Sequence, residues 1–260
     1  SLSLSGYGMD GILPSTLSML TSLTHLALES NARLSGEIPQ DYQQLSQLQY
    51  FSLSQNNISG PIPDSLFTNM KKLRFLYLDD NHIRGTIPSS VGDLPALEVL
   101  LVHANRLHGI AIILILFITL SNARNGLGSI PPTIGNLTSL RFFNASFNLI
   151  TGRIPPQIGQ CLSLENVVIE TTLIDGEIPA SLGNLRNLSI LLLSSNSLTG
   201  TIPASLSNAT KLVNFQVAGN ALHGSLSSGF FNLRQLEQFV VDENEITGSI
   251  PSNLGNLANL

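Results

Sequence analysis

The chain has 260 residues, and 17 acidic against 12 basic side chains give a formal net charge of −5. This mildly acidic balance excludes the basic surface that nucleic-acid binding requires, and the 43% of hydrophobic residues excludes an intrinsically disordered chain. A single cysteine excludes a disulfide within the chain or a cysteine-rich zinc site. No apolar run reaches the roughly 18 residues of a membrane-spanning helix, and the first residues do not read as a signal peptide.

One short motif, Gly-x-Ile-Pro, recurs along the whole chain. Its glycines are Gly36, Gly60, Gly85, Gly128, Gly152, Gly176, Gly200 and Gly248, with degenerate copies at Gly11, Gly109 and Gly224. Successive glycines are separated by 24 or 25 residues, except for 19 residues between Gly109 and Gly128. A period of this regularity is typical of a solenoid, in which each repeat is one structural unit stacked on the next.

A leucine pattern precedes each glycine, as in Leu188, Leu191, Leu193, Asn196 and Leu198. The alternation of its central leucines predicts a short strand with one buried face. One such strand cannot bury that face alone, so stacking the repeats in parallel predicts a continuous leucine core. The strands are expected to end near Ser5, Glu29, Ser54, Asp79, His103, Ser146, Glu170, Ser194, Ala218 and Asp242.

An asparagine follows most of these strands at a fixed distance. Its side-chain amide can bond to unpaired backbone groups of neighbouring repeats. The predicted structural ladder consists of Asn31, Asn56, Asn81, Asn105, Asn148, Asn196, Asn220 and Asn244. Tyr7 and Thr172 replace the asparagine in two repeats.

The complete pattern, Leu-x-x-Leu-x-Leu-x-x-Asn-x-Leu-x-Gly-x-Ile-Pro, resembles the plant-specific leucine-rich repeat. The resemblance covers residues 1–260 as one solenoid fragment of about 10–11 repeats of 24 residues, for which no terminal caps are expected. It implies an α/β-type repeat solenoid, a right-handed superhelix with a concave parallel β-sheet and a convex side of 3-10 or irregular structure.

Known members of this family are the ectodomains of receptor-like kinases and receptor-like proteins, and the polygalacturonase inhibitors. The resemblance therefore implies an extracellular or cell-surface module that recognises a peptide or protein on its concave face, with a possible co-receptor. A membrane would be reached only through segments outside this chain. The alternative is a soluble inhibitor of the polygalacturonase-inhibitor type, and a kinase or a cysteine-paired cap in the full-length protein would separate the two.

The stretch 110–127 is expected to be an irregular, short repeat. It contains eleven uncharged residues, 110–120, too few to span a membrane as a helix. The stretch is either a repeat with a trimmed convex connection, in which this run supplies a strand, or a decayed or wrongly predicted sequence. Its ladder residue would be Asn122 or Asn125.

The alternation of side chains along each predicted strand shows which residues lie on the surface of the sheet. The residues between and beside the inward leucines point to the concave face. We predict a ligand-binding patch there, because aromatic clusters ringed by polar residues anchor many interfaces. The patch contains Tyr50, Phe75, Tyr77, Asp79, Asp80, Val99, Leu101 and His103. A second, weaker patch contains Val168, Ile190 and Leu192.

Acidic residues dominate the predicted concave face. They are Glu29, Asp79, Asp80, Glu98, Glu165, Glu170, Glu237, Asp242 and Glu243, against the bases Arg74 and Arg141. A ligand with basic residues is therefore favoured. Some members of the family bind the terminal carboxylate of a peptide with paired arginines on this face, and no such pair is found in this sequence.

The other short motifs of the sequence do not indicate a catalytic or cofactor-binding site. The Gly-x-Gly-x-x-Gly that begins at Gly6 falls within the repeat period, and the histidines have no zinc-ligand spacing. Cys161 occupies a position that is leucine in other repeats and is expected to be buried. No catalytic residue, metal or cofactor is therefore predicted. Candidate glycosylation sites are Asn57, Asn136, Asn144, Asn187 and Asn208.

Overall fold

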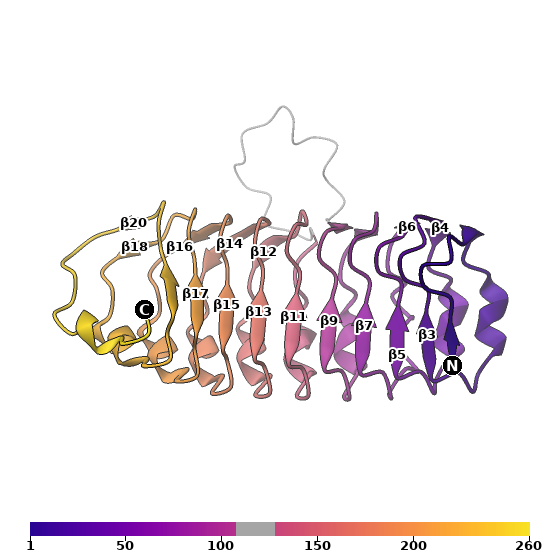
Figure 1. Cartoon of the computed structure of the whole chain (residues 1–260), viewed down its shortest axis with the longest axis horizontal. Helices are drawn as coiled ribbons and strands as arrows, with labels where there is room; N and C mark the ends of the chain where they lie inside the picture. Colours follow the sequence, from indigo (N-terminus) through magenta and orange to yellow (C-terminus); the bar gives the residue numbers. More distant parts are fainter. Residues whose placement is uncertain (108–127) are drawn as a thin grey trace, which may run out of the picture.

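The structure, a computed structural model, describes residues 1–107 and 128–260. Its main element is a parallel sheet of ten short strands in sequence order. The strands are β1 (Leu2–Ser3), β3 (His25–Ala27), β5 (Tyr50–Ser52), β7 (Phe75–Tyr77), β9 (Val99–Leu101), β11 (Phe142–Asn144), β13 (Asn166–Val168), β15 (Ile190–Leu192), β17 (Asn214–Gln216) and β19 (Gln238–Val240). Figure 1 shows them side by side along the long axis, with the chain termini at opposite ends. The predicted solenoid with a parallel sheet is confirmed.

The core lies behind this sheet and is built from the alternate leucines of each strand. Phe51, Leu76 and Leu100 are paired across β5, β7 and β9 and are at most 1% exposed. The strands end two residues earlier than expected, since β7 stops at Tyr77 and not at Asp79. The backbone turns to a φ of +51° at Asp80, although its amide still donates to the His103 carbonyl oxygen at 3.1 Å.

A second row of short strands follows the asparagines. They are β2 (Asp10–Ile12), β4 (Arg33–Glu37), β6 (Asn57–Ser59), β8 (Arg84–Gly85), β10 (Arg106–Leu107), β12 (Thr151–Arg153), β14 (Leu173–Glu177), β16 (Ser197–Thr199), β18 (His223–Gly224) and β20 (Glu245–Ile246). They form separate sheets of two or three strands. Gly36 shows why glycine recurs here, because its φ is +85°, a conformation that side chains disfavour.

The convex side consists of single turns of 3-10 helix. They are η1 (Ser15–Met19), η2 (Gln40–Gln44), η3 (Ser89–Asp93), η5 (Pro132–Asn136), η6 (Pro156–Gln160), η7 (Ala180–Asn184), η8 (Ala204–Asn208), η9 (Ser228–Asn232) and η10 (Leu254–Asn256). The motif proline precedes most of these turns and fixes the extended backbone at the entry, as Pro179 does with a φ of −63°. The 3-10 convex side predicted from the resemblance is confirmed.

The repeats before and after residues 108–127 are direct neighbours. Val99 of β9 pairs with Phe142 of β11, and no strand lies between them in the sheet. On the convex side η3 packs on η5 in the same way, since a Cβ placed on Gly92 would lie 2.5 Å from the Thr133 carbonyl oxygen. The strand and the ladder residue expected within 110–127 lie outside the described residues.

The eight asparagines form a hydrogen-bonded row beside the sheet, and Thr172 interrupts this row between Asn148 and Asn196. Each donates from Nδ2 to two carbonyl oxygens of its own repeat and to one of the preceding described repeat. Asn196 bonds to the carbonyl oxygens of Ile169, Leu193 and Ser194 and accepts from the Thr172 amide at 3.1 Å. These side chains satisfy the backbone groups that the turn leaves unpaired.

Candidate functional site

The concave sheet carries a contiguous group of five side chains, here called the aromatic patch: Tyr50, Phe75, Tyr77, Val99 and Leu101. They come from three adjacent strands, β5, β7 and β9, and all five are half-buried. They face away from the leucine core, as the alternation of a strand requires. The ring centre of Tyr50 lies 5.3 Å from that of Tyr77 and 6.2 Å from that of Phe75. The three rings therefore form one surface.

Glu29 joins the patch from the preceding repeat. The Tyr50 hydroxyl donates a hydrogen bond of 2.6 Å to Glu29 Oε1. Burial, followed by this hydrogen bond, raises the pKa of Tyr50 well above its ordinary value. Burial also raises the pKa of Tyr77, and the carboxylates of Glu29 and Asp79 raise it further. Both hydroxyls therefore stay protonated at neutral pH and lie in a negative field.

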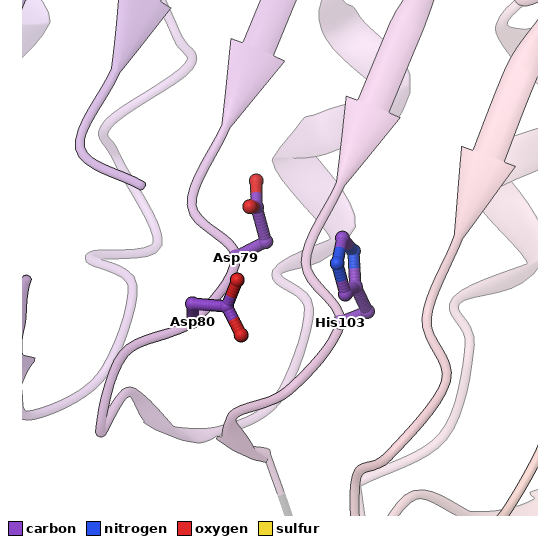
Figure 2. Close-up of side chains that lie close together, drawn as sticks. All are labelled: Asp79, Asp80 and His103. Atoms are coloured by element: carbon purple, nitrogen blue, oxygen red, sulfur yellow. The ribbon is translucent and has the colours of Figure 1, made fainter. Parts of the chain in front are cut away.

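The residues after β7 and β9 add further polar groups at the edge of the patch. Figure 2 shows Asp79 and Asp80 as consecutive residues of one repeat, with His103 beside them on the next. Asp79, predicted to lie on the concave face, is only 7% exposed. Ser54 of the preceding repeat covers it and donates a hydrogen bond of 2.7 Å to Asp79 Oδ1. Asp80 is exposed, and His103 is half-buried with an Nδ1 atom that has no hydrogen-bond partner.

This group has the donor atoms of a metal site. Asp79, Asp80 and His103 each offer a ligand atom, and these atoms lie within 4.8 Å of one another. Carboxylate and imidazole groups bind divalent cations such as zinc or manganese. Three protein ligands would leave coordination positions open, so the group suits a shared or exchangeable cation better than a closed structural site.

The two arginines beside the concave strands are both paired with glutamates. Arg74 Nε lies 2.7 Å from Glu98 Oε1, and Arg141 Nη2 lies 2.8 Å from Glu165 Oε1. Each guanidinium also covers the ring of the next residue, at 5.0 Å from the centre of Phe75 and 5.6 Å from that of Phe142. In the described part of the chain, none of the ion pairs includes Glu29, Asp79 or Asp80.

The second predicted patch lies on β13 and β15. Val168, Ile190 and Leu192 are half-buried there, and Val168 pairs with Leu192 across the two strands. Glu170 lies just beyond Val168, and burial raises the pKa of its carboxyl group. This patch has no aromatic ring, so it offers less contact area than the aromatic patch.

The five candidate glycosylation residues differ in position. Asn57 lies on β6, Asn136 ends η5 and Asn208 ends η8, and all three are exposed. Asn187 is half-buried and accepts a hydrogen bond from Lys211 Nζ at 2.8 Å. Asn144 lies on β11 in the concave sheet, where its Oδ1 accepts from the Ser146 amide at 3.0 Å. A glycan on Asn144 would project over the concave face.

Cys161 is fully buried, as predicted from its position. Burial raises the pKa of its thiol to about 11. The thiol is therefore protonated and unreactive at neutral pH.

Sequence comparison identifies the repeats. The leucine-rich repeat family model matches residues 47–69, 72–94, 139–161 and 187–209. The comparison with curated proteins finds no significant match to this sequence. Within the described residues, the structure has no helix of the length and apolar character needed to cross a membrane.

Structural comparison finds plant proteins with the same architecture. The ectodomain of the receptor kinase GASSHO1/SCHENGEN3 from Arabidopsis thaliana, in complex with CASPARIAN STRIP INTEGRITY FACTOR 2, is 32% identical over 100% of this chain, with a TM-score of 0.85. The Arabidopsis receptor kinase HAESA, in complex with the peptide hormone IDA and the co-receptor SERK1, is 28% identical over 98% of this chain, with a TM-score of 0.69.

A plant ice-binding protein is 26% identical over 94% of this chain, with a TM-score of 0.74. This chain covers 31% of the GASSHO1 structure, 44% of the HAESA structure and 71% of the ice-binding protein. It therefore spans less than half the length of the two receptor ectodomains. The repeats and the structure of this chain resemble those of a binding module, and neither comparison indicates a catalytic domain in this chain.

Proposed function

Because this chain is a leucine-rich-repeat protein, we propose that it is the extracellular recognition module of a plant receptor-like kinase or receptor-like protein. Its ligand is a peptide or protein that lies along the concave sheet and is anchored on the aromatic patch. A kinase or a co-receptor outside this chain then carries the signal. The observation that supports this proposal most directly is three contiguous aromatic rings on a solvent-facing sheet.

The physical basis is the contrast between the two faces of each strand. The inward leucines are already buried and can gain nothing from a partner, whereas the rings of Phe75 and Tyr77 are half-buried. Fully burying an exposed aromatic side chain contributes about 1.5–3 kcal/mol, so covering the exposed part of one half-buried ring contributes about 1 kcal/mol, and covering all three rings contributes about 3 kcal/mol. A water-exposed carboxylate contributes at most about 1 kcal/mol. The rings therefore anchor the ligand, and the charges orient it.

The receptor assignment is supported by the likeness to GASSHO1 over the whole of this chain, and that protein was solved with a bound factor. A soluble module, such as an inhibitor of polygalacturonase, is the alternative. It is supported by the likeness to the ice-binding protein, of which this chain covers the larger share. A membrane helix in the full-length protein would separate the two, because only the receptor needs one.

The proposal is tested by selecting binders from a display library of random peptides about twelve residues long. Wild-type chain is compared with the Phe75→Ala/Tyr77→Ala variant, and Leu162→Ala is the control because Leu162 is 60% exposed outside the concave strands. Wild type and control are expected to enrich the same peptides, and the double variant to lose them. Peptides that bind all three chains equally would contradict the proposal.

A further inference from the structure

We propose that the aromatic patch binds a basic side chain of the ligand, with a guanidinium or ammonium group over the rings of Tyr50 and Tyr77 and between the carboxylates of Glu29 and Asp79. The inference rests on the proposed function and names the chemistry that this surface recognises. Three observations support it: the tyrosine rings, carboxylates that form no ion pair among the described residues, and a ring–guanidinium–carboxylate arrangement found elsewhere in the sheet.

The first observation is an unbalanced charge. Among the described residues, the Glu29 carboxylate accepts from the Tyr50 hydroxyl and Asp79 Oδ1 accepts from the Ser54 hydroxyl, and both donors are neutral. The ion pairs of the described residues lie at Glu98, Glu37 and Glu165. Among the described residues, the carboxylates of Glu29, Asp79 and Asp80 therefore form no ion pair, and a basic ligand group would supply their missing counter-charge.

The second observation is a precedent within the same sheet. The Arg74 guanidinium lies 5.0 Å from the ring centre of Phe75 and bonds to Glu98 at 2.7 Å. The same pattern recurs with Arg141, the Phe142 ring and Glu165. In both cases an aromatic ring and a carboxylate on neighbouring repeats hold one guanidinium. The patch has the same two components, the rings of Tyr50 and Tyr77 and the carboxylates of Glu29 and Asp79. Among the described residues, no guanidinium lies between them.

The third observation is the geometry of the rings. The rings of Tyr50 and Tyr77 are inclined by 43° with 5.3 Å between their centres, so they are tilted and not stacked. A cation is attracted to the negative face of such rings. Glu29 and Asp79 follow β3 and β7, which are two repeats apart, about 9.6 Å by strand spacing. An extended side chain with several donors can reach both carboxylates, as a guanidinium with five N–H groups does.

A divalent metal ion is the competing occupant. It would use Asp79, Asp80 and His103, whose ligand atoms lie within 4.8 Å of one another. A metal ion would leave Glu29 and the ring faces unused, whereas an organic cation uses the rings and both carboxylates. The surface as a whole therefore favours the organic cation.

The test uses the display library on four forms of the full chain. These are wild type, Glu29→Gln, Glu29→Gln/Asp79→Asn and the control Asp41→Asn/Asp64→Asn. The control removes the same two charges from exposed residues outside the concave strands. Wild type and control are expected to enrich Arg or Lys at one peptide position, while the two Glu29 variants lose this preference. The Glu29→Gln variant keeps the test valid even if the change at the buried Asp79 disturbs folding.

One selected peptide is then synthesised with its basic residue and with citrulline or alanine in its place. The replacement should weaken binding to wild type about tenfold and binding to the Glu29→Gln/Asp79→Asn variant less than about twofold. Peptides that need Tyr77 but show no basic preference would overturn this inference and leave the proposed function standing. Binding of neutral peptides that is abolished by EDTA and restored by zinc would overturn it in favour of the metal ion. Failure of every peptide to depend on Tyr77 would instead count against the proposed function.

Discussion

The backbone amide of Val102 donates a hydrogen bond of 3.0 Å to the carbonyl oxygen of Asn144, although 42 residues separate the two in the sequence. The equivalent bond one repeat earlier, from Leu78 to Leu101, is 2.9 Å long and joins residues only 23 apart. The sheet thus keeps its regular bonding across a part of the chain that has 19 additional residues. This relationship leads to the first prediction.

Removal of residues 109–127 should leave the solenoid folded. The shortened chain joins His108 to Gly128 and reads Asn-Arg-Leu-His-Gly-Ser-Ile-Pro, with the regular 24-residue distance from Gly85. Shortening a connection lowers the entropy cost of closing it, by an amount on the order of 1 kcal/mol. Thermal unfolding followed by circular dichroism should therefore show an equal or slightly higher Tm. A Tm lower by more than about 5 °C would show that these residues are part of the stack.

The ladder predicts opposite effects at two neighbouring positions. Asn196→Ala removes the donor to three carbonyl oxygens and the acceptor for the Thr172 amide, and should cost about 1–3 kcal/mol. Thr172→Asn should restore the missing amide and stabilise the chain by about 1 kcal/mol. Urea unfolding measures both, with the exposed Ser197→Ala as the control. The ladder account fails if Thr172→Asn lowers the free energy of unfolding.

The close packing of the convex turns predicts that replacing a turn glycine by alanine lowers the stability of the chain. A Cβ on Gly183 would lie 2.3 Å from the Ser205 carbonyl oxygen of the next repeat, which is backbone and cannot move aside. Gly183→Ala should therefore destabilise the chain by about 1–3 kcal/mol through overpacking. Gly255 occupies the equivalent turn near the end, where a Cβ meets nothing within 4 Å, so Gly255→Ala should change stability by less than about 0.5 kcal/mol. Equal effects of the two changes would contradict this packing.

Glu170 predicts a pH dependence of stability. Burial raises the pKa of its carboxyl group above the ordinary value of 4.5, so the folded chain keeps this proton to a higher pH than the unfolded chain does. The protonated Glu170 carboxyl group therefore stabilises the folded chain fully below the pKa that it has in the unfolded chain. This stabilisation is lost as the pH rises through the pKa that it has in the folded chain. Glu170→Gln should therefore raise Tm more at pH 7 than at pH 4. A gain that is equal at both pH values would show that the carboxyl group is not responsible.

The fold follows from sequence because its determinants repeat. The spacing of Leu188, Leu191 and Leu193 gives both the strand and its buried face, and the same pattern recurs in every regular repeat. The position of Tyr77 on the concave face follows from this alternation alone. The second row of strands was not predicted, although alternation around Ile174 and Gly176 in β14 was available as a signal.

The contacts between repeats could not be predicted in this way. The burial of Asp79 depends on the hydroxyl of Ser54 in the preceding repeat, and a single repeat's pattern does not specify that neighbour. The bond between Tyr50 and Glu29 joins residues 21 apart and depends on how two side chains cross the sheet. The direct pairing of β9 with β11 was not predicted, because the spacing of the glycines does not specify which repeats are neighbours in the sheet.

The most direct test of the central claim is site-specific photo-crosslinking. A photoreactive amino acid replaces Tyr77 on the concave sheet or Leu162 outside it, and each chain is irradiated with the labelled peptide most enriched by the wild-type chain. Binding on the aromatic patch predicts a crosslink from position 77 that unlabelled peptide competes away, and none above background from position 162. Equal crosslinking at the two positions, or crosslinking only at position 162, would contradict recognition by the concave face.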